Sequence, residues 1–459
     1  MAIAFTDRRK SKKSTKSRVD IPHLNYHISE LLTKLKKTSF GITIVLLCTL
    51  LLLNGCQNSS KITQNYIHLT VWHGINPPPN REVFQTLVDR FNQAHPNIEV
   101  EALYVGQADQ QLPKLLTAIV GNTVPDLLWF SPMLTGQLVE LGAIHPLETW
   151  LETNPHKADI NPVMFETMEL DGHLWSIPMA TNNVGIFYRP SLFEAAGITE
   201  IPQTWDDLRE VCRQLTRDEN GDGEPDKYGM LLPLGKGEWT VFTWLPFLYS
   251  GGGDLVEKGE PNLVNDGAIA ALELWQNLLK ERIAMNSQPE RGYENDPLLS
   301  GKVAMQLTGP WTLGYLQETG VDFDVFPIPE GKRHGTVLGG ENLFLMKTGN
   351  TVTERAALEF LDYIMGEEFQ IQWALDTGYL PINLKAQNSE TYRQFVAENP
   401  VLQVFLEQMQ WARSRPLVTG YPRISESLGR AIEATLLGKN PRKALQASQD
   451  RLEWILNLK

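Results

Sequence analysis

Cysteine is scarce in this sequence, whose 459 residues include only Cys48, Cys56 and Cys212. Three cysteines cannot build the disulfide framework that holds many small secreted proteins together. Histidine is also scarce, and the nine histidines form neither a His-Glu-x-x-His pair nor a Cys/His cluster with zinc spacing. The sequence therefore excludes a disulfide-stapled protein and argues against a zinc enzyme.

Motifs of nucleotide binding and of hydrolases are missing as well. Each Gly-Lys pair lacks the glycine five residues earlier that a phosphate-binding loop requires, and no Gly-x-Ser-x-Gly segment occurs. These absences exclude a P-loop ATPase and an α/β-hydrolase. A glycosidase is not excluded, because 54 Asp and Glu residues offer many carboxylate pairs.

Positive charge is concentrated at one end of the chain. Residues 1–37 carry ten Lys and Arg against three Asp and Glu, whereas the whole chain has a net charge of −13. Nucleic-acid binding needs clustered cationic side chains that neutralise phosphates, so the acidic remainder is a poor partner for DNA or RNA. A hydrophobic content of 42% is enough for a substantial core, and the length favours two or three domains.

The basic stretch is followed by the features of a secretory signal. Residues 40–53 are mostly apolar, a run too short to cross about 30 Å of hydrocarbon comfortably as a helix. The tetrapeptide Leu53-Asn54-Gly55-Cys56 is similar to the bacterial lipobox, in which the cysteine is acylated and becomes the first residue. We expect a signal segment with this lipobox over residues 1–55, a lipid on Cys56 and a tether over residues 56–66. The alternative is an uncleaved anchor, which would also place the body outside the cytoplasm.

The body alternates between strand and helix patterns. Residues 68–72 and 98–105 are strand-like, with an amphipathic helical stripe over residues 84–91 between them. The same alternation returns later, with a strand at residues 184–188 and a helix that begins at the capping box Thr204-Trp205-Asp206-Asp207. This alternation predicts an α/β protein with largely parallel sheets.

Tryptophan is abundant at predicted strand ends and in loops. The residues concerned are Trp72, Trp129, Trp239, Trp244 and Trp311. A pyranose ring has an apolar face and equatorial hydroxyl groups, so a sugar site needs flat aromatic surfaces with amide and carboxylate groups nearby. Polar residues close to these tryptophans are His73, Asp126, Asn182, Asn183, Glu341, Asn342 and Arg423. Core packing explains any single tryptophan equally well, and it is the set that indicates a sugar site.

An acidic loop follows the capping-box helix. Its oxygen-bearing side chains occupy positions 1, 3, 5 and 9 of a calcium-binding loop, and they are Asp218, Asn220, Asp222 and Asp226. Position 6 is Gly223, as in such loops, but position 12 is Gly229 instead of glutamate. The loop is either a structural calcium site or a plain acidic turn.

Short segments spread along the chain have the order and spacing of a known family. They include Pro125-Asp126-Leu127-Leu128, the Asn-Asn-Val-Gly-Ile-Phe-Tyr run over residues 182–188, Gly309-Pro310-Trp311, Gly339-Gly340 and Thr377-Gly378-Tyr379-Leu380-Pro381. From about Ile67 to the C-terminus, the chain resembles the bacterial extracellular solute-binding proteins of family 1. These are the carbohydrate or maltose-type substrate-binding lipoproteins of ABC importers.

The resemblance implies an α/β, two-lobed periplasmic-binding-protein type II fold with discontinuous lobes and a hinge. The chain is expected to cross between the lobes near residues 178–181, 326–329 and 379–381. The expected segments are 67–179 plus 329–379 for lobe 1 and 180–328 plus 380–459 for lobe 2.

The resemblance also implies a ligand in the cleft between the lobes, stacked on Trp311 and hydrogen-bonded by Asn182 and Asn183. Other expected cleft residues are Trp72, His73, Trp129, Trp239, Glu341 and Arg423. We expect a binding protein that is not an enzyme. It would capture a sugar, an oligosaccharide or a polyol glycoside and deliver it to the permease subunits of an importer, and through them to the ATPase.

The expected protein is a monomer in the periplasm or another extracytoplasmic compartment, held to the membrane only by its lipid. It binds no nucleic acid and needs no cofactor, apart from a structural calcium ion if the acidic loop holds one. Two alternatives remain open. One is a binding protein for a glycerol phosphodiester or another polar solute, and such a protein would require a basic cleft. The other is a surface-anchored glycosidase.

Overall fold

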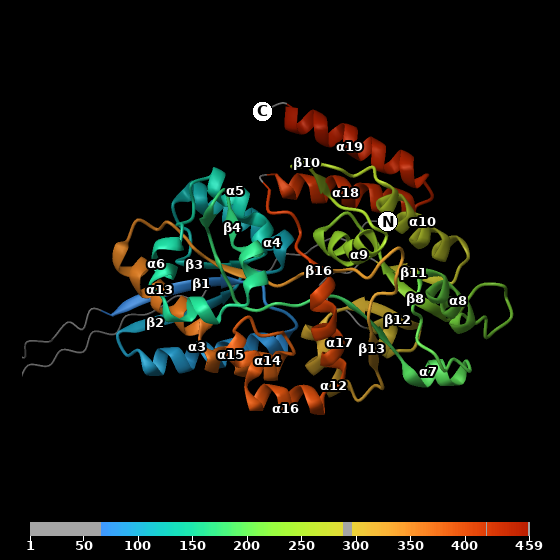
Figure 1. Ribbon diagram of the computed structural model, residues 1–459, viewed down its shortest axis with the longest axis horizontal. Coiled ribbons are helices and arrows are strands. Elements are labelled where there is room, and N and C mark those ends of the chain that lie inside the picture. The colour runs from blue at the N-terminus through green and yellow to red at the C-terminus, as the bar shows by residue number, and fades with distance from the viewer. Residues whose placement is uncertain (1–65, 288–295, 419, 458–459) are drawn as a thin grey trace, which may run out of the picture. The chain divides into compact units, whose positions relative to one another are not determined.

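A computed structural model describes residues 66–287, 296–418 and 420–457 of the chain, all within one unit that spans Asn65–Lys459 (Figure 1). The expected signal segment, Cys56 and all of the expected tether except Tyr66 lie outside these ranges. Within them, no helix combines the length and the apolar character needed to cross a membrane.

A five-stranded sheet, here called sheet 1, forms the centre of lobe 1. Its strand order is β2-β1-β3-β15-β6. Its strands are β1 (Ile67–His73), β2 (Ile98–Tyr104), β3 (Leu127–Phe130), β6 (Ile177–Pro178) and β15 (Asn342–Leu345). Because β15 comes from a distant part of the chain, lobe 1 is built from discontinuous segments.

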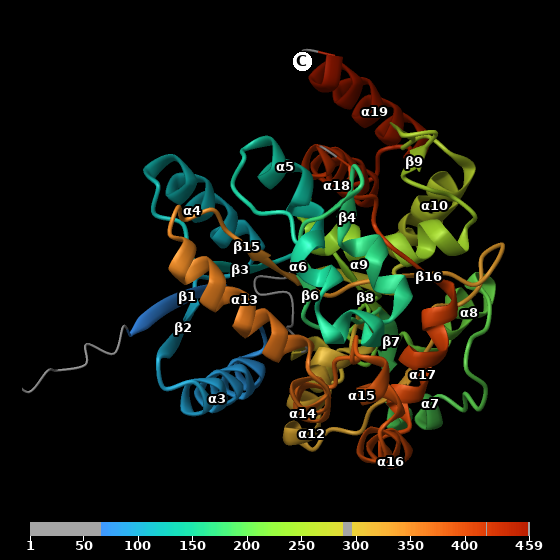
Figure 2. The same ribbon diagram turned by 60° about the vertical axis from the view of Figure 1, so that its left-hand side comes forward.

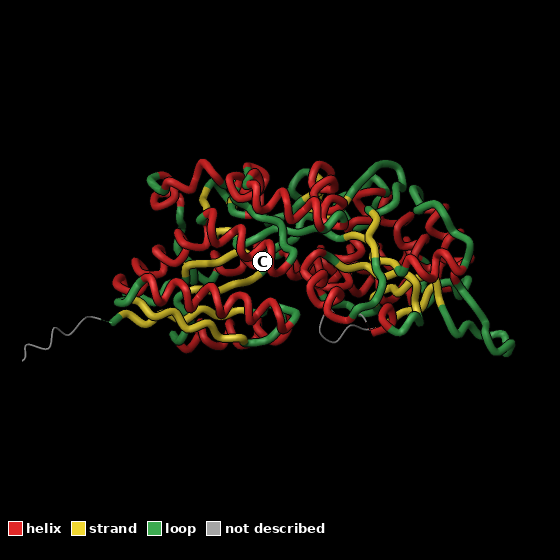
Figure 3. The backbone as a smooth tube through the Cα atoms, turned by 90° about the horizontal axis from the view of Figure 1, so that it is seen from below, coloured by secondary structure: helices red, strands yellow, loops and turns green. Residues whose placement is uncertain are grey.

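Helices cover sheet 1 on both sides, as the red and yellow segments of Figure 3 show. The main ones are α3 (Pro78–Ala94), α4 (Ala108–Gly121), α5 (Thr135–Glu140), α6 (Glu148–Glu152), α13 (Thr351–Met365) and α14 (Glu367–Thr377). The helical stripe predicted over residues 84–91 is buried in α3, which confirms that prediction. α13 packs against β1, and α14 packs against α3.

A second five-stranded sheet, sheet 2, forms the centre of lobe 2, with the order β11-β8-β12-β7-β13. Its strands are β7 (Gly185–Tyr188), β8 (Tyr228–Pro233), β11 (Ala284–Ser287), β12 (Val303–Thr308) and β13 (Asp324–Phe326). The elements that accompany it are α7 (Pro190–Ala195), α8 (Trp205–Leu215), α9 (Glu238–Ser250), α10 (Asp266–Lys280), α11 (Asp296–Leu299), the 3-10 turn η5 (Pro310–Thr312), α12 (Leu313–Thr319), α17 (Val401–Gln408), α18 (Tyr421–Leu436) and α19 (Pro441–Asn457).

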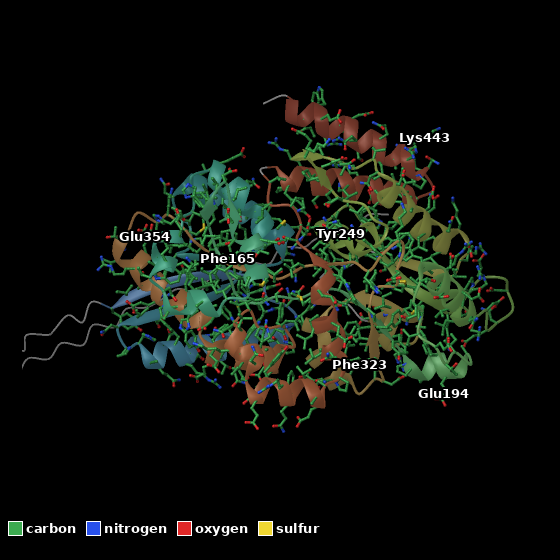
Figure 4. The ribbon with its side chains drawn as sticks, in the orientation of Figure 1. Phe165, Glu194, Tyr249, Phe323, Glu354 and Lys443 are labelled. Carbon is green, nitrogen blue, oxygen red and sulfur yellow. The ribbon has the colours of Figure 1, made fainter. Side chains whose placement is uncertain are left out.

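The last two helices of the chain belong to lobe 2. α18 packs against α9, α10 and α19, and Figure 2 shows it beside α9. Charged side chains lie on the outer helices, as Glu194 of α7 and Lys443 of α19 show in Figure 4. Tyr249 of α9 lies inside, because this helix is apolar on every side and is buried along most of its length.

Local sequence signals account for the start and the burial of α8. The Thr204 side chain accepts from the Asp207 N–H while the Asp207 carboxylate accepts from the Thr204 N–H, so the predicted capping box is confirmed. Cys212 is completely buried on the apolar face of this helix, and burial raises the pKa of its thiol. Cys212 therefore serves as a small apolar core residue.

The sheets are mixed, although the alternation of strands and helices predicts largely parallel ones. β1 is parallel to β2 and β3, and β8 is parallel to β11 and β12. The antiparallel strands are those near the lobe crossings. β15 enters sheet 1 from lobe 2, and β7 and β13 begin and end the long segment of lobe 2.

Three chain segments lie side by side between the lobes. Thr181 exchanges two backbone hydrogen bonds with Leu380, and Asn182 exchanges two with Gly339. The crossing expected near residues 178–181 lies in this region, and the segment 379–381 runs beside it.

The second crossing lies about ten residues later than the expected 326–329. β14 (Thr336–Val337) still pairs with β16 (Ala412–Arg413) and packs on α9, and Lys332 and Arg333 donate their backbone N–H groups to Ser250. These contacts keep the chain on lobe 2 until it reaches Gly339.

A second difference concerns the third crossing, which comes after α16 instead of at residues 379–381. α15 (Leu384–Asn388) and α16 (Glu390–Glu398) pack against α14 of lobe 1, although the expected boundaries place residues 380–459 in lobe 2. The chain then enters lobe 2 with α17, which packs against β13.

Candidate functional site

A cavity of about 580 Å³ lies between the two lobes. Gly74 and Ser131 line it where the chain leaves β1 and β3, and Leu234 and Trp311 line it just beyond β8 and β12. Ligands of open α/β sheets bind outside the carboxyl ends of parallel strands, and both sheets present those ends here. The topology therefore places this cavity where a ligand site is expected.

Four aromatic rings form a cluster in the lining. The Trp311 ring lies 6.0 Å from Trp239, 6.5 Å from Phe242 and 6.3 Å from Tyr379. Trp239 and Phe242 stand three residues apart on α9, so they lie on one face of that helix. Trp311 is 7% exposed. The cluster provides the flat apolar surface on which a sugar ring can stack.

Trp129, on the lobe 1 side, is held by its backbone. The buried side chain of Gln111 donates from Nε2 to the Trp129 carbonyl oxygen at 3.1 Å. Gly74 packs nearby, because a Cβ at this position would meet the Gly106 carbonyl oxygen at 2.6 Å and the Trp129 ring at 3.4 Å. The close approach of these two loops requires glycine and fixes the lobe 1 wall.

A carboxylate at the start of α9 organises the lobe 2 wall. Glu238 accepts hydrogen bonds from Arg415 at 2.7 Å, from the Tyr421 hydroxyl at 3.0 Å and from the Ser425 hydroxyl. The Arg415 guanidinium lies 4.9 Å from the centre of the Phe242 ring. Burial alone would lower the pKa of Arg415, but Glu238, Tyr421 and Glu341 together outweigh it and the pKa is raised. Arg415 therefore stays charged although it is 5% exposed.

Three of the lining residues carry a polar atom that has no hydrogen-bond partner in the protein. These atoms are Asn182 Oδ1, Glu341 Oε2 and Arg415 Nε, all of them buried. Burial raises the pKa of Glu341 to about 7, although the charge of Arg415 opposes the rise. A buried polar atom without a partner costs about 1–3 kcal/mol, so a ligand that supplies the missing partners recovers this energy.

Five of the nine ligand-binding residues expected from the sequence line the cavity. These are Trp129, Asn182, Trp239, Trp311 and Glu341. The structure does not bring the other four, Trp72, His73, Asn183 and Arg423, into the lining.

Each of these four residues is placed elsewhere. The Trp72 ring packs on an apolar cluster of lobe 1. His73 is buried against Phe84, and burial, helped by the charge of Arg81, lowers its pKa to about 4. Asn183 is fully buried and bonds the Phe405 carbonyl and the Gln408 side chain. Arg423 lies in the first turn of α18, between lining residues on that helix.

Sequence reasoning missed several lining residues. They are Gln111, Glu238, Phe242, Tyr379, Arg415 and Tyr421. Two of them had a weak indication in the sequence of a place in the site. Tyr379 lies in one of the segments that carry the family resemblance, and Glu238 directly precedes Trp239. Nothing in the sequence indicated Arg415, because an Arg-Pro pair in a loop has no spacing that points to a ligand.

The acidic loop uses its side-chain oxygens on its own backbone. Asp218 accepts from the N–H groups of Gly221 and Gly223, and Asp226 accepts from those of Glu219 and Asn220. Asp222 accepts from the Glu224 N–H, and Asn220 Oδ1 accepts from Asp222. Over the part of the chain that the structure describes, no three His, Cys, Asp or Glu side chains gather as a metal site would require. Calcium binding stays a prediction of the sequence.

A chelator decides between the two interpretations of this loop. If the loop is a plain acidic turn with its carboxylates engaged as above, EDTA should leave the melting temperature of the protein unchanged. An ion bound only by the native state would stabilise it by mass action. A fall in melting temperature with EDTA that is absent in Asp222→Ala would instead establish the calcium site.

Comparison with known proteins identifies the family. A family model described as bacterial extracellular solute-binding protein matches residues 86–400. The maltotriose-binding protein of Pyrococcus abyssi is 26% identical over 76% of this chain and 73% of its own length. The sn-glycerol-3-phosphate-binding periplasmic protein UgpB of Salmonella typhimurium is 24% identical, over 84% and 91%.

Solved structures of the same fold cover nearly all of the described chain. The maltose/maltodextrin-binding domain MalE from Bdellovibrio bacteriovorus, bound to maltotriose, has a TM-score of 0.74 and 22% identity, covering 85% of this chain and all of that one. UgpB from Mycobacterium tuberculosis, in complex with glycerophosphocholine, has a TM-score of 0.76 and 20% identity, covering 85% and 98%. Since the family model spans most of the chain and the two-lobed fold agrees with it, this protein belongs to the bacterial extracellular solute-binding protein family.

Proposed function

We propose that the protein captures an uncharged sugar, an oligosaccharide or a polyol glycoside in the cavity between its lobes and delivers it to the permease of an ABC importer. The observation that carries the proposal is the pairing of the Trp311 aromatic cluster with three buried polar atoms that lack partners. A sugar ring offers an apolar face to the first and hydroxyl groups to the second. Family membership supports the role of a solute receptor.

The charges of the lining favour a neutral ligand over a phosphodiester. Four acidic side chains line the cavity, against two cationic ones, Lys236 and Arg415. The acidic residues are Asp109, Glu238, Glu341 and Glu426, of which Glu341 carries its full negative charge only above about pH 7. Arg415 is already paired with Glu238. An anionic ligand would therefore meet more repulsion than attraction, whereas sugar hydroxyls can both donate and accept.

The arrangement gives little support to a glycosidase. Such an enzyme needs a carboxylic acid and a carboxylate on either side of one bond. Both oxygens of Glu238 accept hydrogen bonds from neighbouring side chains, so this carboxylate is committed to the wall of lobe 2. The bound sugar is expected to leave unchanged.

Isothermal titration against a panel of solutes tests the proposal. The panel contains mono-, di- and trisaccharides including maltotriose, glucosylated polyols and glycerol phosphates, and bound ligand is recovered and identified. We expect at least one uncharged saccharide or glycoside to bind and to be recovered intact. Binding of glycerol phosphates alone would assign the other solute class, and recovery of a hydrolysed sugar would make the protein a glycosidase.

Attachment to the membrane through Cys56 is part of the proposed function, because a lipid anchor keeps the receptor at the membrane that holds its permease. Two acyl chains make such an anchor stable, at about 0.8 kcal/mol for each buried CH₂ group. Metabolic labelling with a fatty acid should mark the wild type and a Cys48→Ser control, and should fail to mark Cys56→Ser. Equal labelling of Cys56→Ser would refute the lipobox.

A further inference from the structure

One buried amide joins the two lobes beside the cavity. Asn80 lies in the first turn of α3 and is 3% exposed. Its Nδ2 donates to the carbonyl oxygen of Trp311 at 3.2 Å and to that of Asn76 at 3.3 Å. Asn76 and Trp311 both line the cavity, the first from lobe 1 and the second from lobe 2. Asn80 therefore links the backbones of two lining residues on opposite sides of the cleft.

The lobe 1 partner in this link is fixed independently of Asn80. The Arg81 guanidinium donates to Asn76 Oδ1 at 2.6 Å and to the Ile75 carbonyl at 3.0 Å, and it stacks over the Tyr104 ring at 3.8 Å. The Asn76 side chain also donates to the Gly74 carbonyl at 3.0 Å. The loop after β1 thus keeps its shape without the Asn80 amide, which is free to hold Trp311 against it.

The lobe 2 partner is held by its own turn, in which Thr312 donates to the Gly309 carbonyl, and it is also contacted from lobe 1. Trp311 lies in η5, a turn of only three residues. The neighbouring Pro310 carbonyl packs against Gly378 so closely that a Cβ there would lie 2.4 Å from it. This contact orients η5 from one side. The Asn80 side chain, which also belongs to lobe 1, holds η5 at a second point by donating to the Trp311 carbonyl oxygen.

We propose that Asn80 is a positioning residue for the binding tryptophan, because its amide fixes the Trp311 backbone against the lobe 1 wall and so sets the indole ring before the ligand arrives. A ring already in place loses less freedom on binding, which improves affinity without a new contact to the ligand. The gain in affinity rests on the proposed function, whereas the positioning of the Trp311 ring does not.

The positioning is tested without any ligand. In protein labelled with 5-fluorotryptophan, the ¹⁹F resonance of Trp311 is assigned by its disappearance in Trp311→Phe. Asn80→Asp keeps the shape of the side chain but replaces the donor with a carboxylate oxygen facing two carbonyls. We expect the Trp311 resonance to shift or broaden while that of Trp275, buried in α10, stays in place. An unchanged Trp311 resonance would overturn the proposal.

Asn92 supplies a matched control on the same helix. Its amide donates to the Val100 carbonyl at 3.0 Å and accepts from the Val100 N–H at 2.8 Å, entirely within lobe 1. Asn92→Asp should lower the melting temperature but leave the Trp311 resonance in place. If it moves this resonance as much as Asn80→Asp does, the effect is general loosening and the proposal fails.

Ligand binding supplies the second measurement, with maltotriose and any other saccharide that the wild type binds as the probe. Asn80→Asp should weaken binding roughly tenfold, the effect of one well-placed hydrogen bond, and Asn92→Asp should not. Wild-type affinity in Asn80→Asp would overturn the link between positioning and capture. If the wild type binds no saccharide, the proposed function fails, while the fluorine resonances still decide whether Asn80 positions Trp311.

Discussion

Replacing Trp311 with alanine is expected to weaken capture of the sugar by about thirtyfold or more. Aromatic anchors in desolvated sites commonly cost 2 kcal/mol or more when they are truncated, and a change of 1.4 kcal/mol is tenfold in affinity. Trp311 is the common neighbour of Trp239, Phe242 and Tyr379, so its removal opens the centre of the aromatic surface. Isothermal titration with the saccharide that the wild type binds measures the loss.

Two further variants separate stacking from folding. Trp311→Leu keeps an apolar side chain in the cluster but removes the flat ring, so it should bind nearly as weakly as Trp311→Ala. Trp275→Leu removes a fully buried tryptophan of α10 that lies outside the cavity lining, and it should lower the melting temperature while the affinity stays at the wild-type value. Wild-type affinity in both Trp311 variants would move the binding site elsewhere.

Much of the fold could be predicted because its signals are local. The apolar stripe of α3 spans eight residues and the capping box of α8 spans four, and each has the predicted structure. The position of the second crossing is not local. The proline-rich stretch that ends β13 looks like a linker, but contacts with Ser250, far away in the sequence, keep the following residues on lobe 2.

The candidate site was predictable where residue type alone points to a ligand. Trp129, Trp239 and Trp311 line the cavity, yet Trp72 has the same type and packs inside lobe 1. Neighbours in an extended segment point in opposite directions, so Asn182 reaches the cavity while Asn183 bonds the end of α17. Which residue of such a pair faces the ligand depends on the packing of both lobes, and the sequence alone does not contain that information.

The buried carboxyl of Glu341 is expected to make the stability of the protein depend on pH near neutrality. Its pKa is raised to about 7 by burial, against the opposing charge of Arg415, whereas the ordinary value is 4.5. The folded protein therefore holds a proton that the unfolded chain releases between these two values. The free energy of unfolding should fall as the pH rises from about 4.5 to about 7, by roughly 2 kcal/mol after allowance for the partial exposure of the side chain.

Glu341→Gln isolates this contribution, because glutamine is neutral at every pH. Urea unfolding without ligand should give the variant and the wild type the same free energy of unfolding near pH 4, and should make the variant more stable by about 2 kcal/mol at pH 8. Glu426 lines the same cavity, but the hydrogen bond from Arg430 lowers its pKa, so Glu426→Gln should give no gain at pH 8. If Glu341→Gln changes the free energy of unfolding equally at both pH values, this carboxyl titrates as it does in the unfolded chain. Water would then have to reach Oε2, which has no hydrogen-bond partner in the protein.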